Sequence, residues 1–251
     1  MVRGGVTGRV AVVTGGAGSG IGGSTARRLA ADGAAVAVLD VHERRTAEMA
    51  RSIEDGGARA VGLTLDVADR DAANEAVTEV ERTLGPVDIL VNSAAVNALG
   101  PLRTMEPDQW DRVTGVGLTG AFNLIRAVLP GMVERRRGAI VNISSIAAWL
   151  GSANEAPYAA AKAGLQSLTR SVANEGGPHG VRCNAIAPGY IESRFVAANA
   201  ERFAAEIERI PLRRLGTPDE VASLIAFLVS DESAYITGET IVLAGGWYMH
   251  A

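Results

Sequence analysis

Tyr158 and Lys162 are the two residues of this 251-residue chain whose chemistry and spacing fit together best. They are four positions apart, one turn of a helix, so their side chains lie on one face. A free tyrosine has a pKa of about 10, too high for a base at neutral pH. A cation at roughly 4 Å in an effective dielectric of about 20 is worth about 4 kcal/mol, which could lower that pKa by up to roughly three units. The pair predicts a phenol that exchanges protons near neutral pH, although such a pair also arises by chance on exposed helices.

Ser145 strengthens this prediction. It stands thirteen residues before Tyr158 and directly follows a strand predicted at Ala139–Ser144. A serine at the carboxyl end of a strand can hydrogen-bond a substrate oxygen beside the tyrosine. The alternative for the Ser-Ser pair is a helix cap, which fits Ser144. We expect Ser145, Tyr158 and Lys162 to form one catalytic site.

A glycine-rich turn, Thr14–Gly23, follows the first predicted strand and leads into a helix. Glycines let the backbone turn tightly and approach a pyrophosphate, while the helix N-terminus supplies free N–H groups and positive potential. Alone, such a turn also serves ordinary loops, but its place in a strand–helix–strand unit predicts a dinucleotide site. The residues expected to contact the dinucleotide here are Gly15, Ser19, Gly20 and Ile21.

Asp40 ends the second predicted strand, about twenty residues after the glycine turn. A carboxylate there can bond both ribose hydroxyls of NAD, and it repels the 2′-phosphate of NADP. The alternative is a solvated aspartate at a strand end. Arg44 and Arg45 follow and are the residues that would admit NADP. The sequence favours NAD as the cofactor.

Short runs of β-branched residues alternate with amphipathic segments, which predicts an α/β fold: a Rossmann-type, doubly wound parallel sheet of about seven strands with helices on both faces. The strands are nearly continuously apolar, as expected for strands buried on both faces. No linker or repeat interrupts the pattern, so residues 1–251 are predicted to form a single dinucleotide-binding and catalytic domain. The predicted strands are Arg9–Thr14, Ala35–Asp40, Arg59–Leu65, Asp88–Asn92, Ala139–Ser144, Val181–Ala187 and Thr240–Leu243.

Composition excludes several other classes of protein. The net charge is −4 and no basic stripe is present, so neither nucleic acid nor an anionic membrane is an expected partner. Three scattered histidines have no metal-ligand spacing, and no metal is expected. Cys183 is the only cysteine and lies in an apolar run, which indicates a buried structural thiol. No apolar stretch is expected to approach membrane-spanning length, and no signal peptide is recognised, so we expect a cytoplasmic protein.

The catalytic residues and the glycine turn, together with further motifs along the chain, occur in an order and spacing that resemble the short-chain dehydrogenase/reductase family over nearly the whole chain. The resemblance implies that Tyr158 exchanges a proton with the substrate oxygen and that Ser145 orients this oxygen. Lys162 would lower the pKa of the tyrosine and bind the nicotinamide ribose. The motifs that carry the resemblance are Thr14–Gly22, Asp40, Asp66-Val67, Asn92, Ser145, Tyr158, Lys162, Asn184, Pro188-Gly189, Thr237-Gly238 and Gly245-Gly246.

The same resemblance implies a set of cofactor contacts. Asp66 would bond the adenine, with a backbone contact from Val67, while Ile191 and Ser193 would hold the carboxamide end. It also implies a homotetramer with dihedral symmetry. The full cofactor set is Gly15, Ser19, Gly20, Ile21, Asp40, Asp66, Val67, Asn92, Ala94, Tyr158, Lys162, Pro188, Gly189, Ile191 and Ser193.

The chain departs from the family pattern at three places. Four residues instead of three separate Gly15 from Gly20, so the phosphate loop should bulge. The family's Asn-Asn-Ala-Gly reads Asn-Ser-Ala-Ala at 92–95. Gly117 stands where the family has an asparagine that holds a water for a proton relay from the lysine. Asn92 and Ser93 are the candidates to replace this asparagine.

Together these features predict an NAD-dependent oxidoreductase that interconverts a secondary alcohol and a ketone by hydride transfer. An NADPH-dependent 3-oxoacyl carrier-protein reductase is an alternative, and a weakly active nucleotide-binding protein is another, supported only by Gly117. A cofactor-free dehalogenase would lose the lysine and the glycine turn, both kept here. The substrate is a small molecule of unknown identity, and its expected wall is Ser145, Trp149, Asn154 and Tyr190, although packing explains the last three nearly as well.

Overall fold

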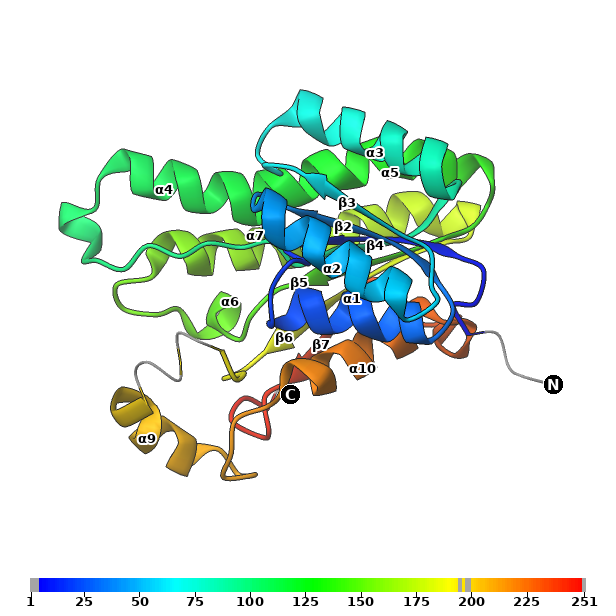
Figure 1. Ribbon diagram of the computed structural model, residues 1–251. Coiled ribbons are helices and arrows are strands. Elements are labelled where there is room, and N and C mark those ends of the chain that lie inside the picture. The colour runs from blue at the N-terminus through cyan, green and yellow to red at the C-terminus, as the bar shows by residue number, and fades with distance from the viewer. Residues whose placement is uncertain (1–4, 194–195, 197–199, 250–251) are drawn as a thin grey trace.

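The computed structural model describes residues 5–193, 196 and 200–249, and these contain one seven-stranded parallel sheet with the strand order β3-β2-β1-β4-β5-β6-β7 (Figure 1). The strands are β1 (Val10–Thr14), β2 (Ala35–Asp40), β3 (Ala60–Thr64), β4 (Val87–Asn92), β5 (Gly138–Ile143), β6 (Val181–Pro188) and β7 (Thr240–Leu243). The chain leaves β1 for β2 on one side and returns to β4 on the other. Ligands of doubly wound sheets bind at the carboxyl ends of the strands at such a switch point. The predicted fold class is confirmed.

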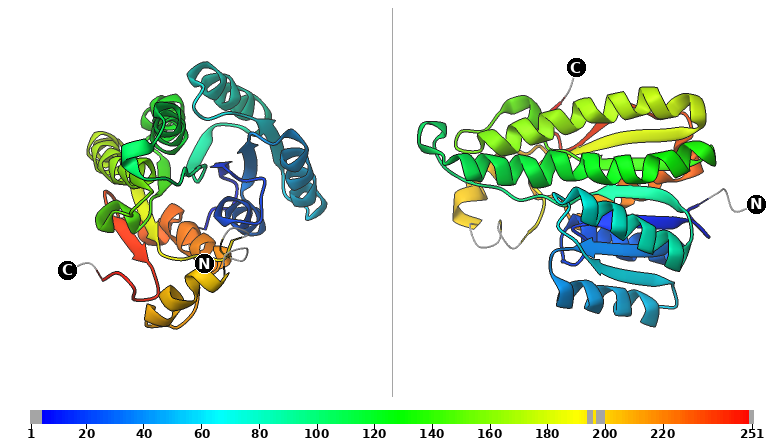
Figure 2. Two further views of the ribbon diagram at one scale, coloured as in Figure 1. Left: turned by 90° about the vertical axis from the view of Figure 1, so that its left-hand side faces the viewer. Right: turned by 90° about the horizontal axis from the view of Figure 1, so that it is seen from above.

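Helices cover both faces of the sheet (Figure 2). One face carries α3 (Arg70–Leu84), α5 (Gly120–Glu134) and α7 (Ala156–Gly176), and the other carries α1 (Ile21–Ala31), α2 (Glu43–Asp55) and α10 (Pro218–Val229). The remaining helices are α4 (Pro107–Thr114), α6 (Ala147–Leu150) and α9 (Ala200–Arg209). In Figure 1, α6 and α9 lie beside the carboxyl ends of the strands.

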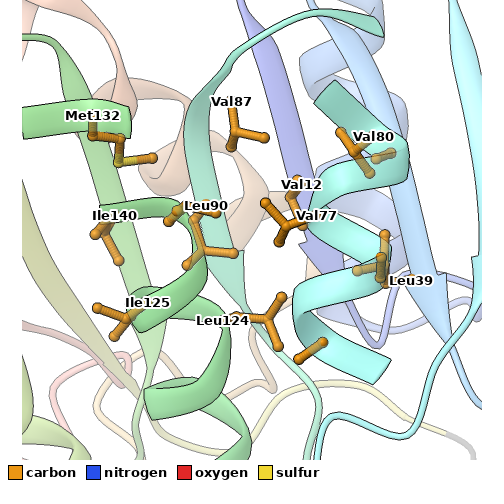
Figure 3. Close-up of a cluster of buried hydrophobic side chains, with 14 of the residues drawn as sticks. Val12, Leu39, Val77, Val80, Val87, Leu90, Leu124, Ile125, Met132 and Ile140 are labelled. Carbon is orange, nitrogen blue, oxygen red and sulfur yellow. The ribbon is translucent and has the colours of Figure 1, made fainter. Parts of the chain in front are cut away.

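The core beneath α3 and α5 shows why the strands are apolar along their whole length (Figure 3). Leu90 and Ile140 project from the central strands β4 and β5 against Leu124 of α5, and Val77 of α3 packs into the same cluster. Alternate residues of the same strands enter a second cluster under α1 and α10. Because both faces of the central strands are buried, most of their positions carry apolar side chains.

One helical stretch is long and apolar enough to contradict the expectation that no segment approaches membrane-spanning length. Residues Pro107–Glu134 form a continuous 28-residue helical stretch with a mean hydropathy of 1.4 in its most apolar window, so by length and composition it could cross a bilayer. The expectation that no segment reaches this length was wrong. In the structure α5 packs on α3, β4 and β5, and its apolar side chains Leu124, Ile125 and Val128 belong to the core. A buried core helix satisfies the same test.

Candidate active site

A cavity of about 760 Å³ opens at the carboxyl ends of the central strands. Its walls come from the turn after β1, the loop after β4, the β5–α7 connection and the segment after β6. These segments are far apart in the sequence, and the parallel sheet brings them together. The predicted site residues that line this cavity are Gly15, Gly20, Ile21, Ser145, Tyr158, Lys162, Pro188, Gly189, Tyr190, Ile191 and Ser193.

The glycines of the first turn are required by close backbone contacts. Gly15 has φ +64°, and a Cβ there would lie 3.0 Å from the Ala94 Cα atom. A Cβ at Gly22 would lie 2.3 Å from the carbonyl oxygen of Gly15, and one at Gly23 would lie 1.7 Å from that of Gly18. Gly20 differs, because a Cβ there would meet open space. The turn is therefore packed tightly onto the start of α1, with Gly20 on its open side.

The additional residue of the turn lies beside a second, outer hollow of about 550 Å³. Gly18 and Ser19 line it, together with Arg27 of α1 and Arg45 of α2. Arg44 is not in its lining and is exposed, 3.8 Å from Glu48. Ser19, which we expect to contact the dinucleotide, borders this outer hollow and is not in the lining of the main cavity.

Asp40 faces the same turn from the end of β2. Its Oδ2 atom accepts a hydrogen bond from the Ala17 N–H at 3.3 Å, and its Oδ1 atom accepts one from the His42 N–H at 3.2 Å. These bonds fix the carboxylate beside the glycine turn. A carboxylate has further lone pairs that can accept hydroxyl hydrogens.

The loop expected at the adenine is held by a residue that sequence reasoning missed. Asp66 is exposed, and its Oδ1 atom accepts from the Ala68 N–H. Asn123, a buried amide in the apolar α5 helix, donates to the carbonyl oxygens of Val67 and Ala68. The sequence signal that could have identified Asn123 was a polar residue within an otherwise apolar helix.

Asn92 turns its amide into the protein. Its Nδ2 atom donates to Asn142 Oδ1 at 2.8 Å, and Asn142 donates onward to Thr169. The side chain of Asn92 therefore joins the ends of β4 and β5 to α7. Among the described residues, Val67, Asn92 and Ala94 border a narrow void next to the main cavity and not the cavity itself.

Lys162 is almost fully buried at the base of the main cavity. Its Nζ atom donates to the carbonyl oxygen of Ile143 at 2.6 Å and lies 5.5 Å from the centre of the Tyr158 ring. Burial disfavours the charged form and lowers the lysine pKa to about 8. Near neutral pH the lysine is thus mostly charged and close to its titration point.

Tyr158 departs from the sequence expectation. Burial raises its pKa above the ordinary value of 10.0, the negative charge of Glu155 raises it further, and a hydrogen bond with Ser145 lowers it. We expected Lys162 to bring this pKa down, but burial raises it, and the lysine ammonium donates its hydrogen bond to the Ile143 carbonyl oxygen. The hydrogen bond does bring Ser145 and Tyr158 together, as expected.

A buried polar clamp, also missed in the sequence, ties β5 to α7 behind these residues. Ser144 Oγ donates to the carbonyl oxygen of Lys162 at 3.0 Å, and Gln166 Nε2 donates to Ser144 Oγ at 3.1 Å. Gln166 lies one turn after Lys162 on the buried face of α7. Ser144 is therefore an internal tether and not the helix cap considered for it.

Comparisons with known proteins agree with this geometry. A family model described as Enoyl-(Acyl carrier protein) reductase matches residues 15–248. An acetoacetyl-CoA reductase of Allochromatium vinosum is 42% identical, with 96% of this chain and 99% of the relative covered. A 3-oxoacyl-[acyl-carrier-protein] reductase FabG of Thermotoga maritima is 38% identical, with 95% and 97% covered. The crystal structure of a putative gluconate dehydrogenase from Agrobacterium tumefaciens superposes with a TM-score of 0.92 at 34% identity, covering 96% of each chain.

The chain belongs to the short-chain dehydrogenase/reductase family. It is an oxidoreductase of a family that binds a nicotinamide dinucleotide. The residues present fit such a group, because the glycine turn lines the main cavity and Asp40 accepts a hydrogen bond from the Ala17 N–H of the same turn. Gly20 lines this cavity, and its missing side chain leaves open space there.

Gly117, where this family has an asparagine, lies in a π-helical turn, Gly115–Thr119, between α4 and α5. A Cβ at Gly117 would lie 3.4 Å from the Ala161 Cβ atom of α7, which is an ordinary van der Waals contact. The void beside it, lined by Asn92, Val116 and Leu165 among others, has no room for a water molecule. The expected water or side-chain replacement is therefore not found there: Asn92 donates to Asn142, and Ser93 lines the main cavity.

Two residues expected in the substrate wall lie elsewhere. Trp149 stacks on Tyr248, with ring centres 5.1 Å apart, and is outside the cavity lining. Asn154 is exposed in a turn at φ +67° and is also outside it. Their neighbours Leu150 and Glu155 line the cavity instead. At its outer end, Tyr190 packs against Phe203 and Trp247.

Proposed function

We propose that this short-chain dehydrogenase/reductase uses NAD to interconvert a secondary alcohol and a ketone. The observation that carries the proposal is the convergence of Ser145, Tyr158 and Lys162 on one cavity that also borders the glycine turn. Alcohol oxidation needs a group that takes the hydroxyl proton, a second group that orients the oxygen, and a nearby hydride acceptor.

In this proposal Tyr158 takes the proton of the alcohol during oxidation and returns it during reduction. Ser145, hydrogen-bonded to Tyr158, holds the substrate oxygen beside the phenol. Lys162 holds positive charge beneath the ring and, through its backbone carbonyl and Ser144, keeps α7 in register with β5. A bound nicotinamide would supply the hydride chemistry, and the positive charge of its oxidised form would favour the phenolate.

The preference for NAD rests on Asp40. Its carboxylate sits beside the glycine turn, where a 2′-phosphate would meet like-charge repulsion. Arg45 in the outer hollow is the residue that would oppose this preference. Titrating each cofactor into the protein tests the point: we expect tighter binding of NAD, and Asp40→Ala should reduce the discrimination. Equal or tighter binding of NADP would refute it.

A second candidate function is supported by the names of the relatives, which include a 3-oxoacyl carrier-protein reductase and an acetoacetyl-CoA reductase. Under this alternative the enzyme reduces a 3-oxoacyl thioester with NADPH. Steady-state assays with secondary alcohols and with acetoacetyl-CoA, each with both cofactors, separate the two. Tyr158→Phe should lower turnover at least about 100-fold under either candidate, and near-full activity would refute the proposed chemistry.

We also propose that the enzyme is a cytoplasmic homotetramer acting on a small molecule, with neither nucleic acid nor a membrane as partner. A dihedral tetramer needs two different self-complementary surfaces. Trp110 and Phe122 are exposed on the α4–α5 side, and Phe227 is exposed on α10, on the other face of the sheet. These two separate apolar areas support the assembly. A single buried cysteine, Cys183, suits a reducing compartment.

A further inference from the structure

Glu155 places a carboxylate in the cavity wall one helical turn before Tyr158. It is the N-cap residue of α7, yet its side chain makes no capping hydrogen bond. Instead, its Oε1 atom accepts a hydrogen bond from Asn97 Nδ2 at 2.9 Å. Asn97 Oδ1 in turn accepts the Ala98 N–H at 2.8 Å. Asn97 is held by its own loop, and it holds the Glu155 carboxylate in place.

The other carboxylate oxygen of Glu155 accepts no hydrogen bond from the residues that the structure describes. The Glu155 loop is nevertheless fixed to the β4 loop, because the Gly100 N–H donates to the Asn154 carbonyl oxygen. A partly buried, fixed carboxylate with a spare acceptor favours a ligand that brings a donor. Both Asn97 and Glu155 line the same cavity as Ser145 and Tyr158.

The charges around Tyr158 favour a neutral ligand. The positive charge of Lys162 and the negative charge of Glu155 lie on the same cavity and offset one another. Glu192 also lines it but interacts with the cation of Arg214. Among the described lining residues no arginine is present to pair with a carboxylate or phosphate. An anionic group close to the reacting carbon would therefore face Glu155 without a compensating cation besides the buried lysine.

We propose that Glu155, positioned by Asn97, selects neutral substrates that carry a hydroxyl group next to the reacting carbon, as vicinal diols, polyols and hydroxyketones do. This inference rests on the proposed alcohol–ketone chemistry. Three residues of helix advance about 4.5 Å, so a group bonded to Glu155 lies near, but not on, the oxygen that Tyr158 deprotonates. Glu155 is a substrate-binding residue in this proposal, and Asn97 is a positioning residue.

The test compares a matched pair of substrates, cyclohexanol and 1,2-cyclohexanediol, with NAD as oxidant. We expect wild-type kcat/KM to favour the diol by about 10-fold or more, the range of a hydrogen bond to a charged group. Glu155→Gln retains the shape and the bond to Asn97 but loses the charge, and should reduce this ratio by a similar factor. Asn97→Ala should raise KM for the diol more than it lowers kcat. Glu175→Gln, an exposed glutamate near the far end of α7, is the control and should leave the ratio unchanged.

A pH profile gives a second readout, independent of the hydroxyl. The charge of Glu155 raises the pKa of Tyr158. In Glu155→Gln the acid limb of cyclohexanol oxidation should therefore move to lower pH, because the phenolate then forms more readily. A residue with a purely structural role would not move this limb.

The outcomes separate this inference from the proposed function. If cyclohexanol is oxidised as well as the diol, or if Glu155→Gln leaves the ratio unchanged, the selection by Glu155 is refuted while the alcohol chemistry stands. If acetoacetyl-CoA is reduced and neither alcohol is oxidised, both are refuted. If no substrate turns over, the diol's effect on the melting temperature of the NAD-loaded protein decides: stabilisation of wild type but not of Glu155→Gln supports the inference, and no stabilisation refutes it.

Discussion

Lys162 carries a positive charge to an almost fully buried position, and burial lowers its pKa to about 8 from an ordinary 10.5. The hydrogen bond that its Nζ atom donates to the Ile143 carbonyl oxygen does not cancel this cost. The site therefore keeps a destabilising group for its chemistry, as functional sites often do.

This cost predicts a gain in stability when the charge is removed. Below pH 8 the folded protein must charge the buried lysine. Between pH 8 and pH 10.5 the unfolded chain binds the additional proton, so the lysine's destabilising effect fades as pH rises. Lys162→Met should therefore be more stable than wild type at pH 7, by up to about 3 kcal/mol less the lost bond to Ile143, while losing activity. Urea unfolding at pH 7 and pH 9.5 measures this.

The difference between the two proteins should shrink at the higher pH. A Lys162→Met variant that is less stable than wild type by the same amount at both pH values would contradict the argument. Lys162→Arg is the control, because an arginine keeps its charge at both pH values. It should remove this pH dependence of the stability without making the protein more stable at pH 7.

At the scale of elements, the glycines of the first turn and of α1 have two different roles. Some are needed for close backbone packing, and others leave room for a ligand. Gly23→Ala would place a Cβ 1.7 Å from the Gly18 carbonyl oxygen, whereas Gly20→Ala would meet open space. We expect Gly23→Ala to lower both the melting temperature and the affinity for the cofactor. Gly20→Ala should fold normally and lower only the affinity for the cofactor, since Gly20 borders the cavity. Calorimetry and cofactor titration of both variants distinguish these effects, and equal melting temperatures would contradict the assignment.

The π-helical turn at Gly117 gives a second prediction at this scale. Gly117→Asn restores the amide usual in the family on the side facing α7, and it should raise turnover or leave it unchanged. Gly117→Ala, whose Cβ at 3.4 Å from Ala161 is tolerable, is the matched control without an amide. Stopped-flow measurement of proton release with a pH indicator reads the relay directly. If the asparagine variant lost activity while folded and the alanine variant did not, a proton relay through an amide at position 117 would be refuted.

The elements themselves follow well from the sequence. The predicted strands Arg9–Thr14 and Val181–Ala187 differ from β1 and β6 by one residue at one end each, because strands buried on both faces carry mostly apolar side chains. The sequence Thr-Pro-Asp-Glu at 217–220 is typical of a capping box, and it starts α10. Loops were harder: Trp149 and Asn154 were expected at the substrate, but their directions depend on a turn at Gly151 and on Tyr248, which no local pattern reveals. Gln166 and Glu155 were missed for the same reason, since their partners lie 22 and 58 positions away in the chain.

At the scale of the molecule, the small residues of α7 bear on assembly. Small side chains of this kind allow the close approach of a second helix, and α7 has them at Ala160, Ala163, Gly164 and Ser167. Gly164 serves this purpose within the chain, because a Cβ there would lie 2.8 Å from the Leu118 Cδ2 atom. Ala160 and Ser167 remain exposed. The case for a tetramer therefore rests more on the exposed aromatic side chains than on the small residues.

Two separate apolar areas predict a stepwise loss of assembly. Phe122 lies on α5 and Phe227 on α10, helices that cover opposite faces of the sheet. In a dihedral tetramer each area would form one of the two kinds of self-complementary interface. A charge at the centre of an apolar interface must be desolvated without a partner, so Phe122→Asp and Phe227→Asp should each yield dimers, and the double variant should yield monomers.

Light scattering at micromolar concentration measures this, with Thr78→Asp on the exposed face of α3 as the control that stays tetrameric. A wild-type mass near the 26.0 kDa of one chain would contradict the tetramer. If both single variants stayed tetrameric, the two aromatic side chains would not be the contacts that hold it together.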